Sequence, residues 1–515
     1  FSMEHLEELG LIKIDVLSLR NLTIIREVLD QIDNPPDLYT MPTDDEATWA
    51  LLDRADTTGV FQLEKEGIRQ LLRQMHPRQF EDVAVVLALY RPGPMAEIPH
   101  YLQNRAHPES IVYPHPLLEP VLKETYGVMI YQEQIMETAR IIGGFSLGQA
   151  DILRKAMSKK QQDVMGRYRE QFLEGALVQG IDAGQAAEIF SLMEKFAGYG
   201  FNKSHSYAYG RVAWAMAWLK ANHPLPFYQS ILNHVIGAEV KTGQYLYECR
   251  QRRIPVLGPD IRVSSDRWQI ENGALRMPLA VMKGIGTALL PRIEEVQKNG
   301  EFPGVIDTIA RLWAQKVNES QLRVLVDGGA FDFYGINRAT LRENMTRILN
   351  YAHIIRVEKE EVLFDYSIAS EPTLVKHRED PMEKSTREKA VFGFYFCEHP
   401  VQTLRKGRFS NTDPIAFIQD VTGFVRILGR VASYHPHKTK KGDLMCFVTV
   451  EDETGQIDLA VMPDTFARQR DLILEGTLLY IQGKKDRPGS VLVRSMEKIT
   501  SVADTGSQAG ERPDA

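Results

Sequence analysis

Cysteine is scarce in this chain of 515 residues, which contains 3: Cys249, Cys397 and Cys446. No two of them are close enough in sequence to form a CxxC metal-binding pair or a disulfide framework. Because disulfide-rich domains are typical of oxidising compartments, the scarcity favours a reducing one. We therefore expect a cytoplasmic protein.

Several other patterns are missing. No apolar run approaches the roughly 20 residues that a membrane-spanning helix needs, so we expect no membrane partner. The GxxxxGK[ST] spacing of a P-loop is absent, as are Ser-His-Asp and Cys-His arrangements for nucleophilic catalysis. His435-Pro436-His437 is the one tight histidine pair, and no carboxylate or thiol motif accompanies it. It predicts a surface loop and not a metal site.

The chain is 43% hydrophobic and 25% charged, with a net charge of -7. Its length predicts roughly three or four domains. The net charge neither supports nor excludes nucleic acid as a partner, because a phosphate backbone responds to local clusters of Lys and Arg. The chain opens at Phe1 inside a well-patterned segment, so we expect it to be part of a longer protein.

Hydrophobic periodicity predicts an α+β multidomain chain. Acidic residues at 44–46 are typical of a helix start, and 356–389 is charged and less patterned, which is typical of a linker. Alternating runs at 447–450 and 478–481 predict a small β barrel. The expected divisions are a short first segment (1–35), a mostly helical region (40–236), a mixed region (237–350), a linker and connector (351–420), the barrel (421–500) and a disordered tail (501–515).

Lys13 and Asp15 lie two apart in an apolar run that predicts a buried strand, and alternation sends both side chains to one face. A charged pair there is costly unless it is used or paired. The functional interpretation is a metal-ligating Asp15 and a phosphate-facing Lys13. The alternative is a salt-bridged pair at a strand edge.

A basic cluster follows on a predicted helix, with Lys155 and Lys159 one turn apart and Arg154 and Lys160 nearby. Such a cluster suits a triphosphate or a DNA backbone. A solvated helix face is the alternative.

The segment 198–206 concentrates glycine, cationic and hydroxyl residues just before another predicted helix. Backbone amides at a helix N-terminus favour anions, and Lys203 and His205 could add charge. The alternative is a pair of helix caps. The candidate phosphate-binding residues are Asn202, Lys203, Ser204 and His205.

Lys283-Gly284-Ile285-Gly286 resembles the hairpin of helix-hairpin-helix modules, where glycines let the backbone approach a DNA phosphate. Asp327-Gly328-Gly329 is a second candidate, and a plain turn is the alternative for both. In the predicted barrel, basic residues gather around a loop beside Phe424 and Tyr434, which suits single-stranded DNA; protein contacts are the alternative. These basic residues are Arg426, Arg430, Lys438, Lys440 and Lys441.

The order of these motifs resembles the C family of DNA polymerases, the bacterial polymerase III alpha subunits, up to about Ile499, and most closely its Firmicutes-type or error-prone members. The matching stretches begin at Gly10 (GLIKIDVLSLRNLTI), Thr58 (TGVFQLE), Leu89 (LYRPGP), Tyr126 (YGVMIYQEQ), Ile152 (ILRKAMSKK) and Phe196 (FAGYGFNKSH).

The resemblance implies a palm remnant at 1–35, fingers at 40–236, a helix-hairpin-helix region at 237–350 and an OB-fold at 421–500. It places Asp15 at the third catalytic aspartate, with Lys13 beside it, and the basic cluster and the 202–205 loop near the incoming nucleotide. The other two aspartates belong to an Asp-x-Asp element that this sequence lacks. The implied cofactor is Mg²⁺, and the expectation for this chain alone is DNA binding without primer extension.

The implied activity is that of a DNA-directed DNA polymerase, a nucleotidyltransferase. The implied partners are primer-template DNA, dNTPs and single-stranded DNA. The family's peptide for the sliding clamp would fall at Glu360–Phe364, where the usual leading Gln is absent. A non-catalytic DNA-binding scaffold built from the same modules is the alternative function.

Overall fold

A computed structural model gives the architecture of the chain. It describes residues 5–6, 9–11, 18–158, 161–298, 300–360, 370–397, 399–405, 409–418, 422–439, 441–487 and 489–499. The chain divides into two compact units, Phe1–Ile231 and Leu232–Ala515.

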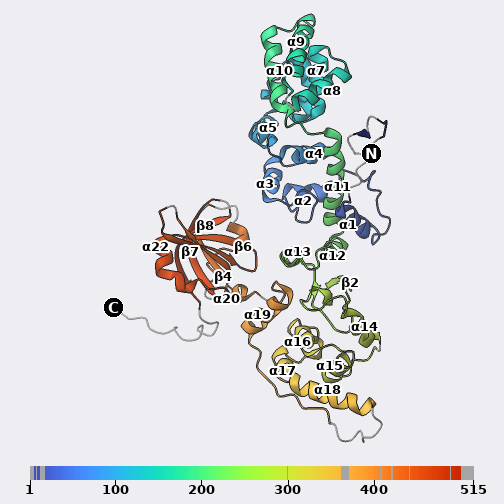
Figure 1. Ribbon diagram of the computed structural model, residues 1–515, viewed down its shortest axis with the longest axis vertical. Helices are drawn as coiled ribbons and strands as arrows, with labels where there is room; N and C mark the ends of the chain where they lie inside the picture. Colours follow the sequence, from blue (N-terminus) through green and yellow to red (C-terminus); the bar gives the residue numbers. More distant parts are fainter. Residues whose placement is uncertain are drawn as a thin grey trace. The chain divides into compact units, whose positions relative to one another are not determined.

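The described part of the first unit is built from helices (Figure 1). The mostly helical character predicted for this part of the chain is therefore confirmed. Its helices are α1 (Arg20–Leu29), α2 (Glu46–Asp53), α3 (Glu66–Met75), α4 (Phe80–Leu89), α5 (Ile98–Ala106), α6 (Glu119–Leu122), α7 (Gln132–Gly143), α8 (Leu147–Ser158), α9 (Gln162–Val178), α10 (Ala183–Ala197) and α11 (Lys203–Asn222), with α12 (Pro224–Asn233) at the boundary.

The start of α2 shows why local sequence predicted these helices well. Asp45 is the N-cap, and its carboxylate accepts a hydrogen bond from the backbone N–H of Thr48 at 2.7 Å. This satisfies one of the amides that a helix start leaves without an intrahelical partner. The predicted helix start at residues 44–46 is confirmed.

Helices α7 to α10 share one hydrophobic core, which includes Ile135, Phe172 and Phe190. Helices α7 and α9 approach closely where two glycines meet, since a Cβ on Gly175 would lie 1.9 Å from the carbonyl oxygen of Gly143. This close approach requires glycine at position 175, and α8, which carries the basic cluster, packs against both α7 and α9.

The long helix α11 packs against α1, α2 and α4. Near its C-terminal end Lys220 is completely buried, and its ammonium group donates to the carbonyl oxygens of Asp56 at 2.9 Å and Thr58 at 2.7 Å. A buried ammonium group is tolerated only when its donors are satisfied. Lys220 thereby holds the loop that contains Asp56 and Thr58 against α11.

In the residues of the second unit that the structure describes, helices combine with two sheets, one of them a barrel. Its elements are α13 (Glu239–Gln251), β1 (Val256–Leu257), β2 (Gln269–Glu271), β3 (Ala274–Arg276), α14 (Leu290–Lys298), α15 (Val305–Ala314), α16 (Glu319–Asp327), α17 (Arg338–Glu343), α18 (Met345–Glu360), α19 (Pro381–Phe392), α20 (Pro400–Arg405), α21 (Ile415–Ile418), β4 (Gly423–Lys438), β5 (Leu444–Glu451), β6 (Gln456–Val461), α22 (Pro463–Gln469), β7 (Leu478–Arg487) and β8 (Ser490–Lys498).

Both ends of the predicted linker are helical, so the linker prediction for 356–389 is wrong at 356–360, which ends α18, and from Pro381, where α19 begins. Glu388 on α19 is fully buried and accepts hydrogen bonds from Arg338 at 3.1 Å and from the backbone N–H of Cys397 at 2.7 Å. One of the charges that made this stretch look like a linker, Glu388, is therefore used in a buried ion pair. Charge composition alone could not show their partners.

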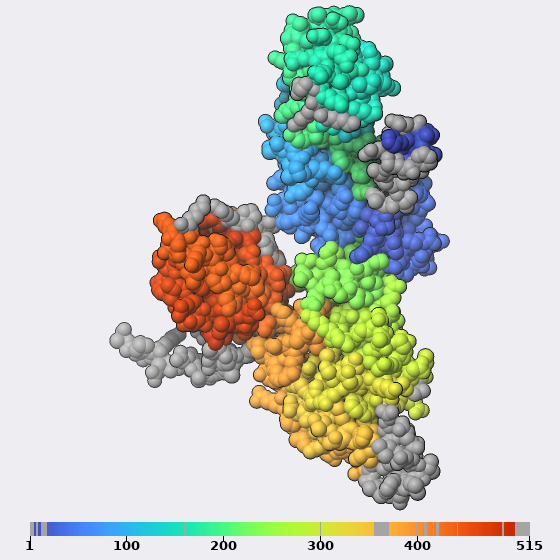
Figure 2. Space-filling view, viewed as in Figure 1, coloured from blue at the N-terminus to red at the C-terminus, as the bar shows by residue number. Residues whose placement is uncertain are grey.

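Strands β4 to β8 close into a barrel in the order β4-β5-β6-β8-β7, with β6 and β8 parallel and the other pairs antiparallel. It forms a rounded body, orange to red in Figure 2. Alternate residues point into a core that includes Val448, Val450 and Leu459. The predicted OB-fold barrel is confirmed.

One surface prediction needs correction. Residues His435-Pro436-His437 lie inside strand β4 and not in a loop, although all three are exposed. The proline is tolerated because β4 pairs with β7 only at 423–430, so one side of this end of the strand is an edge. Separately, none of the helices that the structure describes is both long and apolar enough to cross a bilayer.

Because Lys220 is buried and hydrogen-bonded, we predict that it stabilises the folded chain. Lys220→Met keeps the volume but leaves the carbonyls of the 56–58 loop without their donor, which should cost about 2–3 kcal/mol of unfolding free energy. Chemical denaturation of the whole chain measures it. The exposed Lys65→Met is the matched control and should change stability by less than ~0.5 kcal/mol. Equal effects of the two substitutions would contradict an anchoring role for Lys220.

Candidate nucleotide and nucleic-acid binding sites

The basic cluster on α8 is already paired with a carboxylate. Asp151 accepts hydrogen bonds from Arg154 at 2.8 Å and lies 2.8 Å from the ammonium group of Lys155. Lys155 and Arg154 together hold the pKa of Asp151 below its ordinary value. The other two predicted members, Lys159 and Lys160, lie outside the described residues. A phosphate group at this site must share the two cations with Asp151.

Gln132, the first residue of α7, joins this cluster to the glycine-rich loop before α11. Its side-chain oxygen accepts a hydrogen bond from Arg154 at 2.9 Å, and its side-chain nitrogen donates to the carbonyl of Gly200 at 2.9 Å. The backbones of Tyr131 and Phe201 also pair as a short parallel bridge. Two segments that the sequence marked separately therefore meet at one place.

Asn202 is the N-cap of α11, and its side-chain oxygen accepts a hydrogen bond from the backbone N–H of His205 at 2.8 Å. The ammonium group of Lys203 lies 2.7 Å from the carboxylate of Glu124, and Glu133 accepts from the backbone N–H of Lys203. Asn202 thus caps a helix, as the alternative interpretation of this segment expected. Capping does not exclude a role in anion binding, because Ser204 and His205 stay exposed at the helix start.

The structure separates Lys203 from His205. Lys203 faces the rings of Tyr131 and Tyr207, at 5.7 and 5.5 Å, while the ring of His205 lies 4.1 Å from that of Tyr209. Two residues along a helix correspond to about 200° of rotation, so these side chains leave α11 on opposite faces. The predicted set 202–205 is therefore not one surface.

The sequence analysis missed Arg91 as a site residue. Its guanidinium group lies 3.9 Å from the ring centre of Phe201, and burial lowers its pKa. The same turn contacts the loop again at Gly93, where a Cβ would lie 2.3 Å from the ring of Tyr199 and where the backbone has φ +103°. The motif LYRPGP was visible in the sequence, but nothing in it indicated which loop it supports.

In the second unit, the Lys283–Gly286 hairpin comes directly before the turn that leads into α14. Gly284 has φ +90°, and a Cβ at Gly284 or Gly286 would meet no atom within 4 Å. Lys283 pairs with Glu239 at 2.8 Å. The open backbone fits the predicted approach to a phosphate. The second candidate does not, because a Cβ at Gly329 would lie 2.2 Å from the Arg338 guanidinium group.

On the barrel, Lys438 and Lys441 are exposed beside the β4–β5 turn, and Lys440 lies outside the described residues. Arg430 was placed wrongly among the DNA-facing cations: it is half-buried, bonded to Tyr395 and 3.7 Å from Glu451.

The strand register adds an outer row that the sequence did not show, running through adjacent positions of all five strands: His435, Phe447, Ala460, Leu492, Lys484 and Phe424. Three of its apolar members are exposed, Phe447 at 43%, Leu492 at 40% and Phe424 at 50%. Exposed aromatic residues on an OB-fold are typical stacking platforms for single-stranded bases.

The predicted catalytic residues Lys13 and Asp15 lie outside the described residues. Within the described ranges, no group of three or more His, Cys, Asp or Glu side chains is arranged to hold a metal ion.

Three family models match the chain. The bacterial DNA polymerase III alpha subunit finger domain matches residues 21–180, a helix-hairpin-helix motif matches 253–341, and an OB-fold nucleic acid binding domain matches 425–499. These segments contain the basic cluster, the Lys283–Gly286 hairpin and the barrel.

Whole proteins are similar over nearly the whole chain. DNA polymerase III subunit alpha of Bacillus subtilis (strain 168) is 37% identical over 494 residues, which is 94% of this chain and 44% of that protein. The subunit of Staphylococcus aureus (strain COL) is 36% identical over 493 residues, 94% of this chain and 46% of that protein. The chain spans about half the length of these curated relatives. The matching modules and this identity show that the chain is similar to bacterial DNA polymerase III alpha subunits over nearly its whole length.

Proposed function

We propose that this chain supplies the nucleotide- and DNA-binding modules of a template-directed DNA polymerase, which adds dNTPs to a primer 3′ hydroxyl in the bacterial cytoplasm. The observation that carries the proposal is the Gln132 bridge. It brings Arg154 and Lys155 beside the loop and helix start at 200–205. The guanidinium and ammonium groups, with the exposed Ser204 at the start of α11, would form a site for the phosphates of a dNTP.

Arg154 and Lys155 would bind the triphosphate by displacing part of their contact with Asp151. Because that contact is partly exposed, its loss costs little compared with charge-assisted bonds to phosphate. Asn202 and Ser204 would position the anion at the α11 start. Lys203 would act only after leaving Glu124, so its proposed role is weaker than that of Arg154.

Divalent metal ions, in this family Mg²⁺, would supply the activation of the 3′ hydroxyl and the stabilisation of the leaving pyrophosphate. Asp15, with Lys13 beside it, is the proposed ligand in this chain. The described residues supply binding and positioning, and no step through a metal is assigned to them. A sliding clamp remains a further proposed partner, and residues 361–364 of its predicted contact lie outside the described residues.

The hairpin and the barrel would bind DNA in separate ways. Gly284, Gly286 and Lys283 would contact duplex phosphates. Lys438, Lys440 and Lys441 would attract single-stranded DNA to the barrel. A non-catalytic scaffold would need these two modules but no nucleotide site. The match of residues 21–180 to a polymerase finger domain therefore favours the polymerase.

Arg154→Ala together with Lys159→Ala, in the polymerase assembled with this chain, should raise the KM for dNTP by about a hundredfold or more, since each lost charge-assisted bond costs roughly 1.5–3 kcal/mol. Steady-state primer extension measures it. Arg154→Lys should recover part of the loss, because it keeps the charge without the bidentate fork. Arg140→Ala, which removes an exposed arginine from α7, is the control. Unchanged kinetics in the double variant would reduce the cluster to a solvated helix face.

Gly286→Ala should weaken binding of the chain to duplex DNA by about tenfold, or ~1.4 kcal/mol, with the melting temperature nearly unchanged. The added methyl group meets no protein atom, so it obstructs only an approaching phosphate. A fluorescence anisotropy titration measures the affinity. Gly148→Ala is the control: its added methyl group also meets no atom within 4 Å, and the variant should bind duplex DNA normally. Gly335→Ala would not serve, because the positive φ of +70° at this position would strain any residue with a Cβ. Normal binding by Gly286→Ala would show that the hairpin is a plain turn.

Lys438→Ala with Lys441→Ala should flatten the salt dependence of single-stranded DNA binding. Losing two phosphate contacts should reduce the slope of log K against log salt by about 1.4. Oligonucleotide affinity of the full chain across a salt series measures this slope. Phe447→Ala is the comparison: it should weaken binding at every salt concentration and leave the slope unchanged. An unaltered slope in the double lysine variant would remove these lysines from the DNA-binding surface.

A further inference from the structure

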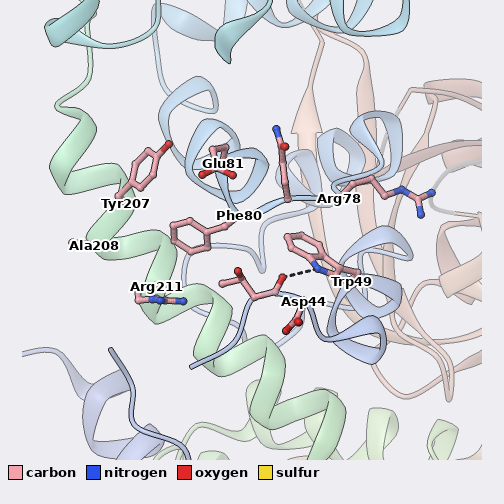
Figure 3. A pocket seen from close by; sticks show the side chains of 10 residues that line it. Asp44, Trp49, Arg78, Phe80, Glu81, Tyr207, Ala208 and Arg211 are labelled. Carbon is pink, nitrogen blue, oxygen red and sulfur yellow. Dashed lines mark hydrogen bonds between the residues drawn. The ribbon is translucent and has the colours of Figure 1, made fainter. Parts of the chain in front are cut away.

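A pocket of about 740 Å³ opens on the first unit, between α2, α4 and α11 (Figure 3). None of the nucleotide-site residues discussed above lines it. Tyr207 and Arg211 on α11 follow Lys203 at spacings of four, so the pocket lies on the face of the helix opposite His205. The lining residues that matter are Asp44, Trp49, Arg78, Phe80, Glu81 and Tyr207.

Three aromatic side chains, each from a different helix, surround the pocket in Figure 3. The ring centres of Phe80 and Tyr207 lie 5.7 Å apart in an edge-to-face arrangement. Trp49 is held by its indole N–H, which donates to the carbonyl of Thr43 at 2.9 Å, and by Trp214, with ring centres 4.5 Å apart. The walls are therefore flat, apolar and fixed in place before any ligand binds.

The polar groups at the pocket are, by contrast, not engaged. Among the described residues, no hydrogen bond or ion pair involves the carboxylates of Asp44 and Glu81, the hydroxyl of Tyr207 or the guanidinium group of Arg78. Arg211 differs, since it donates to the carbonyls of Met41 and Tyr39. The free groups offer two strong acceptors, a hydroxyl and an exposed cation to a ligand.

The charges around the pocket cancel, with Asp44 and Glu81 against Arg78 and Arg211. A neutral lining disfavours both a compact anion and a lone cation. It suits a flat, uncharged ligand that can stack on rings and donate hydrogen bonds to carboxylates. A nucleobase has these properties, and a flanking phosphate could reach Arg78 outside the pocket.

We propose that this pocket binds the base of one unpaired nucleotide in a single-stranded nucleic acid, separately from the dNTP site and the barrel. The base stacks among Trp49, Phe80 and Tyr207, and Arg78 pairs with its phosphate. Glu81 accepts a hydrogen bond from an exocyclic amino group. The pocket therefore prefers cytosine, which has an amino group, to thymine or uracil, which present a carbonyl at the same position.

Photo-crosslinking on the full-length chain tests this proposal. The probes are single-stranded decamers that carry either one 5-iodocytosine or one 5-iodouracil, and peptide mapping locates the cross-link. We expect cross-links in the peptides that contain Trp49, Phe80 or Tyr207, and a higher yield with iodocytosine. Tyr207→Ala should lower this yield about five- to tenfold, as the loss of a stacking partner does.

Matched variants separate recognition from folding. Tyr207→Phe keeps the ring and should retain the cross-link, and Glu81→Gln should reduce the preference for iodocytosine. Arg78→Ala should lower the yield, whereas Arg167→Ala, another exposed arginine of the same unit, should not. Arg154→Ala tests the proposed dNTP site and should leave this cross-link intact, so either proposal can fail without the other.

Three results would overturn the proposal. The first is cross-linking confined to residues 423–499, and the second is equal yield from Tyr207→Ala and the unchanged chain. The third is a pocket that binds a Lys- and Arg-rich peptide in a Tyr207-dependent manner while excluding the oligonucleotide. That last result would assign the aromatic walls to a cationic protein partner.

Discussion

Gln132 accepts a hydrogen bond from Arg154 and donates one to the carbonyl of Gly200, and the position of the candidate nucleotide site depends on these two contacts. The short bridge between Tyr131 and Phe201 aligns the same two segments through their backbones. Without this junction, the basic helix α8 and the start of α11 would be two unrelated surface features. With it, the cations of α8 lie beside the exposed Ser204 at the start of α11.

The cations of this site are compensated by carboxylates before any ligand binds. Asp151 forms ion pairs with both Arg154 and Lys155, and Glu124 forms one with Lys203. Such pairs keep long side chains ordered, and they lower the cost of holding several positive charges together. A phosphate that replaces a carboxylate then meets side chains already close to their binding positions. The arrangement favours exchange of partners over capture by free, mobile cations.

Helix α11 gives the first unit two distinct surfaces. One face carries Tyr209 and His205, and the ring of His205 contacts both Tyr209 and Phe201. The other face carries Tyr207 and Arg211, which line the aromatic pocket. Lys220 fixes the far end of the helix by holding the 56–58 carbonyls. A single rigid element can thus present two different binding surfaces because helical geometry separates residues two apart by more than half a turn.

Local sequence was sufficient for features governed by neighbours in the chain. The acidic start of α2 and the strand character of β5 and β7 follow from capping and from the two-residue period of strands, which are short-range effects. The motif order also indicated the similarity to these polymerase subunits. Glycine at 284, with its positive φ, could be predicted to mark a turn, because turns of that kind favour glycine.

Only the tertiary structure decided which predicted residues are exposed and which are bound by other segments of the chain. Arg430 looked like a DNA-facing cation, but its partners Tyr395 and Glu451 come from elsewhere in the chain. The outer barrel row that contains Phe424 and Phe447 exists only through strand register. Arg91 reaches Phe201 across 110 positions of sequence. Periodicity and charge patterns indicate the secondary-structure element in which a residue lies. Its burial, ion pairing and stacking depend on which distant segment of the chain packs against that element.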